Sequence, residues 1–186
     1  MVKKNKYIIK NIVIAAAVAM FFSCNNSLSN VQKIGISENE PIGEEYNSNL
    51  KYTDSGRVKA NLISTKLFDY TNRDFPFHEF TDGATLYIYD NENRKSTIVA
   101  DYAYVYTETD LIDMRSNVVI TTHDNRVLKT DQLYYDQSKE WLYTNKPVSF
   151  KTEQDLINGN GFDSNSKFTN AEVLEVTGII TLQEED

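Results

Sequence analysis

Apolar and polar residues alternate in short runs along most of this chain, and turn-forming residues separate the runs. The segments ATLYIYD at 84–90 and STIVADYAYVY at 96–106 are clear examples. No segment keeps a 3.6-residue apolar period for three helical turns. Short strands with frequent turns are typical of all-β sandwiches, barrels and jelly rolls, so we expect an all-β domain.

Further strands are expected where similar patterns recur. Their approximate ranges are 57–70, 110–122, 126–136, 140–152, 156–162 and 172–183. We expect a loop at 74–83, which ends on the turn signal Asp82–Gly83. The glycines of NGNG at 158–161 favour a turn, because glycine adopts positive φ at little cost.

A weak internal repeat of 30 residues indicates which side of these strands faces inward. IVADYAYVY at 98–106 aligns with LKTDQLYYD at 128–136, and other similar residues recur at the same spacing. In the second copy the apolar parity breaks at Asp131–Gln132, as it does at a β-bulge or strand bend. The repeat places an equivalent corner at Asp101–Tyr102.

These corners imply a folded antiparallel sheet with one continuous apolar lining. We expect the lining to comprise Leu86, Ile88, Ile98, Ala100, Ala103, Val105, Ile112, Met114, Val118, Ile120, Leu128, Leu133, Tyr135, Leu142, Val148 and Phe150. Such a lining is either a dry core or an apolar cavity that holds a ligand, and the pattern alone leaves both open.

The N-terminus has the features of a secretory signal. Four lysines precede the apolar run Ile12 to Phe22, which is too short to cross a membrane, and Ser23 provides a small residue at a cleavage site. Cys24 follows as the only cysteine, so it has no partner for an internal disulfide. FFSC is similar to the lipoprotein acylation motif, and a chance cysteine beside an ordinary cleavage site is the alternative. We expect a signal peptide at 1–23, a lipid anchor on Cys24, a flexible tether at 24–49 and a domain at 50–186.

Charge and composition argue against several classes of function. The 186 residues have a formal net charge of −8, and removal of four lysines changes 19 basic residues to 15 against 27 acidic ones, or −12. Such a surface repels nucleic acid. The two histidines, His78 and His123, lack metal-ligand spacing, and no nucleophile motif is present. We expect no catalytic residue, no metal and no cofactor.

Several motifs together resemble the LptC family, the periplasmic component of lipopolysaccharide export, in its lipoprotein form. The matching segments, in the family's order between residues 50 and 183, are YTDSGRVKANL at 52–62, FP at 75–76, STIVADYAYVY, SNVVI at 116–120, LKTDQLYYDQ at 128–137, NGNGFDSN at 158–165 and Gly178–Ile179. The resemblance implies a twisted, V-shaped open β-jelly roll of the OstA-like type, built of two antiparallel sheets.

The resemblance also implies a function and partners. The interior would receive acyl chains of lipopolysaccharide from an inner-membrane ABC transporter and pass them to the bridge protein LptA. Transporter contact would lie near 58–70, and the LptA-binding edge near Ile179 and Ile180. Cys24 would replace the transmembrane helix of better-known members, and Asn25 and Asn26 give no acidic surface-export signal. We therefore expect a lipid-anchored protein on the periplasmic face of the inner membrane of a Gram-negative bacterium.

Two other classes of function stay open. One is a β-sandwich envelope lipoprotein that binds glycans or acts as a scaffold, for which an exposed Trp141 could be a sugar platform. The other is an enzyme, for which no site is visible. An accessible apolar cavity would favour the lipid carrier, and a closed core would favour the scaffold.

Overall fold

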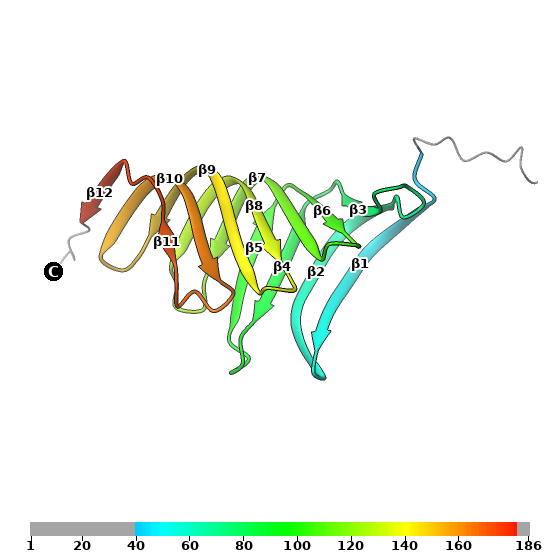
Figure 1. The fold of residues 1–186 in the computed structure, drawn as a ribbon, viewed down its shortest axis with the longest axis horizontal. Coiled ribbons are helices and arrows are strands. Elements are labelled where there is room, and N and C mark those ends of the chain that lie inside the picture. Colours follow the sequence, from blue (N-terminus) through cyan, green and yellow to red (C-terminus); the bar gives the residue numbers. More distant parts are fainter. Residues whose placement is uncertain (1–39, 182–186) are drawn as a thin grey trace, which may run out of the picture. The chain divides into compact units, whose positions relative to one another are not determined.

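The computed structural model describes residues 40–181, and within that range the fold consists of strands and turns without a helix (Figure 1). The all-β prediction is confirmed. The strands are β1 (Gly43–Asp54), β2 (Arg57–Asp69), β3 (Phe77–Phe80), β4 (Ala84–Tyr89), β5 (Lys95–Ala100), β6 (Tyr102–Tyr106), β7 (Leu111–Thr121), β8 (Val127–Asp136), β9 (Trp141–Lys151), β10 (Asp155–Asn165), β11 (Glu172–Val173) and β12 (Gly178–Thr181).

The strands form one antiparallel meander in which each long strand is bent. β3 and β4 pair with successive parts of β2, and β5 and β6 pair with successive parts of β7. Each of these two pairs of short strands is therefore one bent strand interrupted at its corner. The two sheets of the jelly roll are hydrogen-bonded into a single sheet, folded along a line that crosses the long strands and falls between the paired short ones.

The fold line divides the sheet into two walls. Wall A contains β4, β5, β12 and the strand halves 57–63, 118–121, 127–130, 148–151 and 155–160. Wall B contains β3, β6, β11 and the strand halves 66–69, 111–115, 133–136, 141–144 and 162–165.

Strands cross the corner in two alternating ways. From β5 to β6, the inward residues Ala100 and Ala103 are three positions apart, whereas in β7 Met114 and Val118 are four apart. Neighbouring strands therefore differ by one residue at the corner, and the register shifts by one there, as at a β-bulge. Both predicted corners, at 101–102 and 131–132, are confirmed by these shifts.

The sequence at the corner suits this backbone. Ser116 and Asn117 both have positive φ, at 62° and 51°, and Asn tolerates this conformation better than most residues. Pro147 lies on an inner strand but between the two stretches of β8–β9 pairing, where its missing N–H breaks no ladder bond to β8. The Thr130 hydroxyl donates to the Pro147 carbonyl at 3.0 Å and ties adjacent strands together at the fold line.

Two expectations for the N-terminal half are wrong. The predicted tether 24–49 includes Gly43–Asn49, which the structure places in β1, so the strand begins before the expected domain start at residue 50. This segment reads as polar because β1 is an outer strand and mostly exposed. The predicted loop 74–83 contains β3, whose four residues are too few to show a period. Residues 1–39, including the expected signal peptide and Cys24, lie outside the described residues.

Two expectations for the C-terminal half also need correction. NGNG does not form a turn between strands, since residues 158–161 lie inside β10 at its corner. The predicted strand 172–183 is divided into β11 and β12. The segment between them bonds β10 at its bend, where the N–H of Leu174 donates to the Gly161 carbonyl and that of Thr177 to the Asn158 carbonyl.

Close approach of this segment explains one of the glycines. A Cβ on Gly159 would lie 2.4 Å from the Leu174 carbonyl oxygen and 2.5 Å from a Val173 methyl. We predict that Gly159→Ala lowers the free energy of unfolding by about 1–3 kcal/mol, since overpacking forces the backbone apart. Gly178→Ala is the matched control, because its added Cβ meets nothing within 4 Å. Urea unfolding that shows equal losses for both variants would contradict this account.

Candidate functional site

The interior between the two walls collects the predicted lining into one cluster. Fifteen of the sixteen predicted residues are buried, and Val105 is partly buried against them. Ile98 and Ile120 on wall A, and Met114 and Leu133 on wall B, are completely inaccessible to solvent. The inward parity assigned from the repeat is therefore correct on both sides of the corner.

Seven further apolar residues belong to this cluster that the sequence did not indicate. They are Ala60, Leu62, Leu67, Phe80, Ala84, Phe162 and Phe168. Alternation in VKANLI at 58–63 could have shown Ala60 and Leu62. Phe80 lies in a segment interpreted as a loop, and Phe168 lies in a true loop, where no period exists to reveal it.

The interior is packed along most of its length and contains a small cavity near β1. This cavity measures about 140 Å³, and its lining residues are Leu50, Lys51, Tyr52, Ala60, Leu62, Leu86, Val105, Ile112 and Gln137. Pockets for drug-sized ligands occupy roughly 300–1,000 Å³. A long acyl chain therefore needs the two walls to separate or side chains to move.

Two larger grooves lie along the corner rather than in the interior. They measure about 530 and 500 Å³ and are lined mostly by polar residues. Asp82 and Asp101 contribute to the first, and Lys129 and Asp131 to the second. Their polarity makes them poor sites for acyl chains, so the smaller apolar cavity marks the better candidate.

One buried polar group faces this apolar cluster without a partner among the described residues. Tyr135 is 1% exposed, and its hydroxyl makes no hydrogen bond there. Burial raises the pKa of this hydroxyl, which stays neutral at physiological pH. An unsatisfied hydroxyl costs free energy in a dry core, so this position is chemically unusual for a purely structural interior.

The walls are also joined across the open side, away from the corner. Lys59 at the start of β2 lies 2.9 Å from a carboxylate oxygen of Glu140, which follows the β8–β9 turn. The two side chains are 15% and 34% exposed, so the pair is partly screened by solvent. It connects wall A to wall B at the end that contains the cavity.

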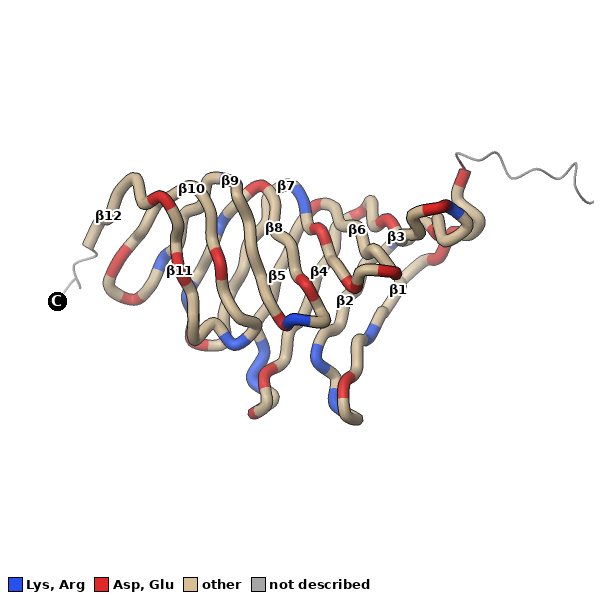
Figure 2. The backbone as a smooth tube through the Cα atoms, in the orientation of Figure 1, with Lys and Arg blue, Asp and Glu red and all other residues tan. Residues whose placement is uncertain are grey.

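Over the described strands and turns, the charged residues form no basic patch. Figure 2 shows Lys and Arg interspersed with Asp and Glu over the strands and hairpin turns. Among residues 40–181, no group of His, Cys, Asp or Glu is arranged to hold a metal. None of these residues forms a helix that could cross a membrane.

The glycan alternative has less support at Trp141. This residue lies on β9, between β8 and β10, and is not on an edge strand. Its indole N–H donates to the Asp163 carboxylate at 3.1 Å, and the residue is only partly exposed. Tyr143 and Tyr134 stack on the outer face at 5.1 Å between ring centroids. Each ring therefore covers part of the other, which leaves less aromatic surface for a sugar.

The predicted partner edge is exposed. Ile179 and Ile180 lie on β12 and are 62% and 56% exposed. Within the described part of the chain, β12 pairs only with β10, so one side of its backbone is not covered. At the other end, β1 pairs only with β2, whereas β2 is paired on both sides. Within residues 40–181 the uncovered N-terminal edge is therefore β1, and the transporter contact expected near 58–70 stays a prediction.

Comparison with known families matches nearly the whole chain. A family model described as "LptC: Lipopolysaccharide-assembly, LptC-related" matches residues 12–181. No curated protein matches the chain. The matched range includes every described strand, both walls and the whole apolar cluster.

Proposed function

Because the chain belongs to the LptC family of lipopolysaccharide assembly, we propose that it is a lipid-carrying relay whose apolar interior holds the acyl chains of lipopolysaccharide in transit. The protein takes part in lipopolysaccharide transport in a Gram-negative envelope. The observation that supports the role as a lipid carrier is the continuous apolar cluster, which extends from Ala60 in β2 to Phe162 in β10.

The physics of the cargo supports an apolar carrier. An exposed CH₂ group costs about 0.8 kcal/mol in water, so a lipid with several long chains does not cross the periplasm unprotected. The interior is lined by side chains from both walls, and wall separation would expose one continuous apolar surface. The cavity beside Tyr52 and Val105 gives such a separation a starting point at the β1 end.

The two strand edges that are uncovered in the described part of the chain suit a relay. An uncovered strand edge offers backbone N–H and C=O groups to which a neighbouring strand can pair. We propose that β1 faces the inner-membrane ABC transporter and that β12 pairs with an LptA-like bridge protein. Such head-to-tail pairing extends the apolar interior from one protein to the next.

The same proposal includes acylation of Cys24 at the periplasmic face of the inner membrane. The N-terminal sequence supports acylation of Cys24, since the FFSC motif ends an apolar run that is too short to span a bilayer. Two or more acyl chains hold a protein firmly where one does not. The anchor would keep the domain near the transporter.

A charge on the lining tests the carrier. We predict that Val118→Glu reduces photo-crosslinking to lipopolysaccharide in cells to background, because a carboxylate there is buried without a partner. Val99→Glu is the control, since Val99 is 46% exposed on the outer face of the same wall. Circular dichroism must show both variants folded. A folded Val118→Glu protein that crosslinks normally would mean that the interior is only a core.

Backbone pairing at β12 tests the relay. One of the adjacent N–H groups of Ile179 and Ile180 faces β10 and the other faces outward, because donors alternate along an antiparallel strand. Proline at the outward position should abolish binding to the LptA-like protein, since it removes a ladder donor, while alanine there should have little effect. Pull-down that is unchanged by either proline would place the docking edge elsewhere.

Removal of the thiol tests the anchor. We predict that Cys24→Ala loses labelling by a fatty-acid analogue and shifts from the membrane fraction to the periplasmic extract. A variant that stays in the membrane without label would argue against acylation and for an uncleaved N-terminal segment.

A further inference from the structure

Phe168 closes part of the open side from a loop between β10 and β11. The side chain is 2% exposed and belongs to the apolar cluster, although its backbone lies outside any strand. Its φ is 57°, in the left-handed region that bulky residues rarely adopt. Such backbone strain persists only where the surroundings enforce it, and it is found at clamps and switch segments.

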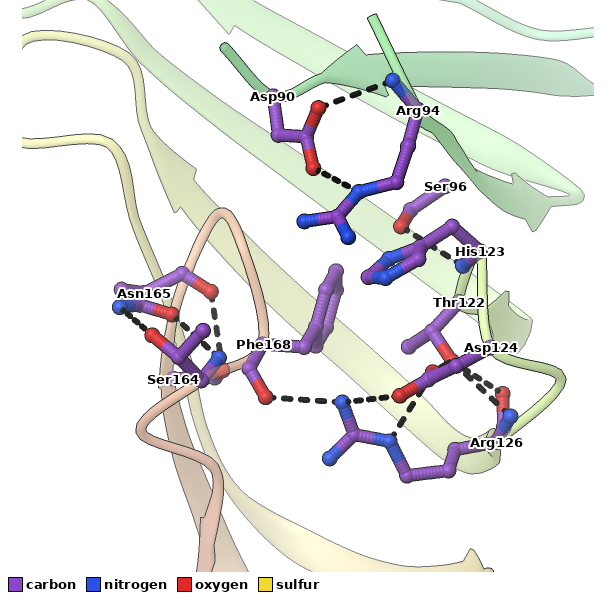
Figure 3. A network of polar contacts seen from close by, with 11 residues as sticks. Asp90, Arg94, Ser96, Thr122, His123, Asp124, Arg126, Ser164, Asn165 and Phe168 are labelled. Carbon is purple, nitrogen blue, oxygen red and sulfur yellow. Dashed lines mark hydrogen bonds and ion pairs between the residues drawn. The ribbon is translucent and has the colours of Figure 1, made fainter. Parts of the chain in front are cut away.

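Polar contacts within the loop hold Phe168 in this conformation. The N–H groups of Phe168 and Thr169 donate to the main-chain and side-chain oxygens of Asn165, at 2.9 and 3.0 Å. Ser166 donates its N–H to the Glu140 carbonyl at 2.8 Å, which fastens the loop to wall B. Figure 3 shows the Phe168 ring directed from this loop toward His123 on the opposite turn.

The Arg126 side chain connects the loop to wall A. Arg126, after the β7–β8 turn, donates from its guanidinium to the Phe168 carbonyl at 2.9 Å (Figure 3). Its second partner is Asp124, at 2.9 Å. Burial opposes the charge on Asp124, but hydrogen bonds from Arg126 and Thr122 lower the pKa of that carboxyl to about 2. The carboxylate therefore orients Arg126 throughout the physiological pH range.

We propose that the 166–171 loop is a displaceable plug, latched by Arg126, and that Phe168 occupies space in the interior that an acyl chain takes when lipid is bound. This inference rests on the proposed carrier function. The Phe168 side chain fills apolar space from a loop with a strained backbone. Because Phe168 lies outside the strands, its side chain can move out of the interior without breaking strand-to-strand hydrogen bonds. The entering acyl chain replaces the apolar contacts of the ring, and release of the loop relieves its backbone.

The latch is tested first without lipid, by hydrogen exchange of the full chain. We expect Arg126→Leu to speed exchange at the Phe168 and Thr169 amides by about tenfold or more, since a hydrogen bond from a charged donor is lost. Arg94→Leu is the matched control, because Arg94 lies nearby in Figure 3 but pairs with Asp90 and not with the loop. Equal loop exchange in wild type and Arg126→Leu would overturn the latch.

The plug is tested by adding lipopolysaccharide to the wild-type chain. We expect amides of β7 to β9 to exchange more slowly and those of Phe168 and Thr169 to exchange faster, because the loop is expelled. Slower strand exchange with unchanged or slower loop exchange would overturn the plug and leave the carrier function intact. No change at any amide would overturn the carrier function, and the plug with it, even where Arg126→Leu still loosens the loop.

Discussion

The structure depends on one constraint, which is that each strand must keep its apolar side chains inward on both sides of a bend. Side chains alternate across a strand, so a bend of the wrong length would turn the apolar face of one half toward solvent. The chain solves this by alternating steps of three and four residues at successive corners, as between Ala100 and Ala103 and between Met114 and Val118. The same kind of corner therefore recurs at every second strand. Because two strands with their turns occupy about 30 residues, the sequence repeats with that period.

That constraint also explains which parts of the fold were readable from the sequence. Central strands carry the alternation on both sides of the corner, so the repeat identified their inward residues correctly. β1 was missed because an outer strand buries few side chains, and its Ser48 is the one residue that the structure buries there. Phe168 was missed because it lies in a loop, where no apolar period exists, and its ring packs against strands distant in sequence.

The same geometry gives the interior two different properties. Along the strands the walls are continuous and well packed, apart from the small cavity near β1. Across the open side the walls are joined by side chains, notably the Lys59–Glu140 pair and the Arg126 contact with the loop. A few partly exposed side-chain contacts of this kind are together weaker than a hydrogen-bonded strand ladder. The side opposite the corner is therefore where the fold can open while its strand order persists.

The central claim is that lipid enters between the walls, and a crosslinking map in cells tests it most directly. A photo-reactive residue would replace inward positions Ile98, Ile120 and Leu133 and outward positions Val99, Val119 and Tyr134, one at a time. The account predicts lipopolysaccharide adducts at the inward set only. Adducts of equal yield at outward positions, or none at the inward positions of folded proteins, would contradict it.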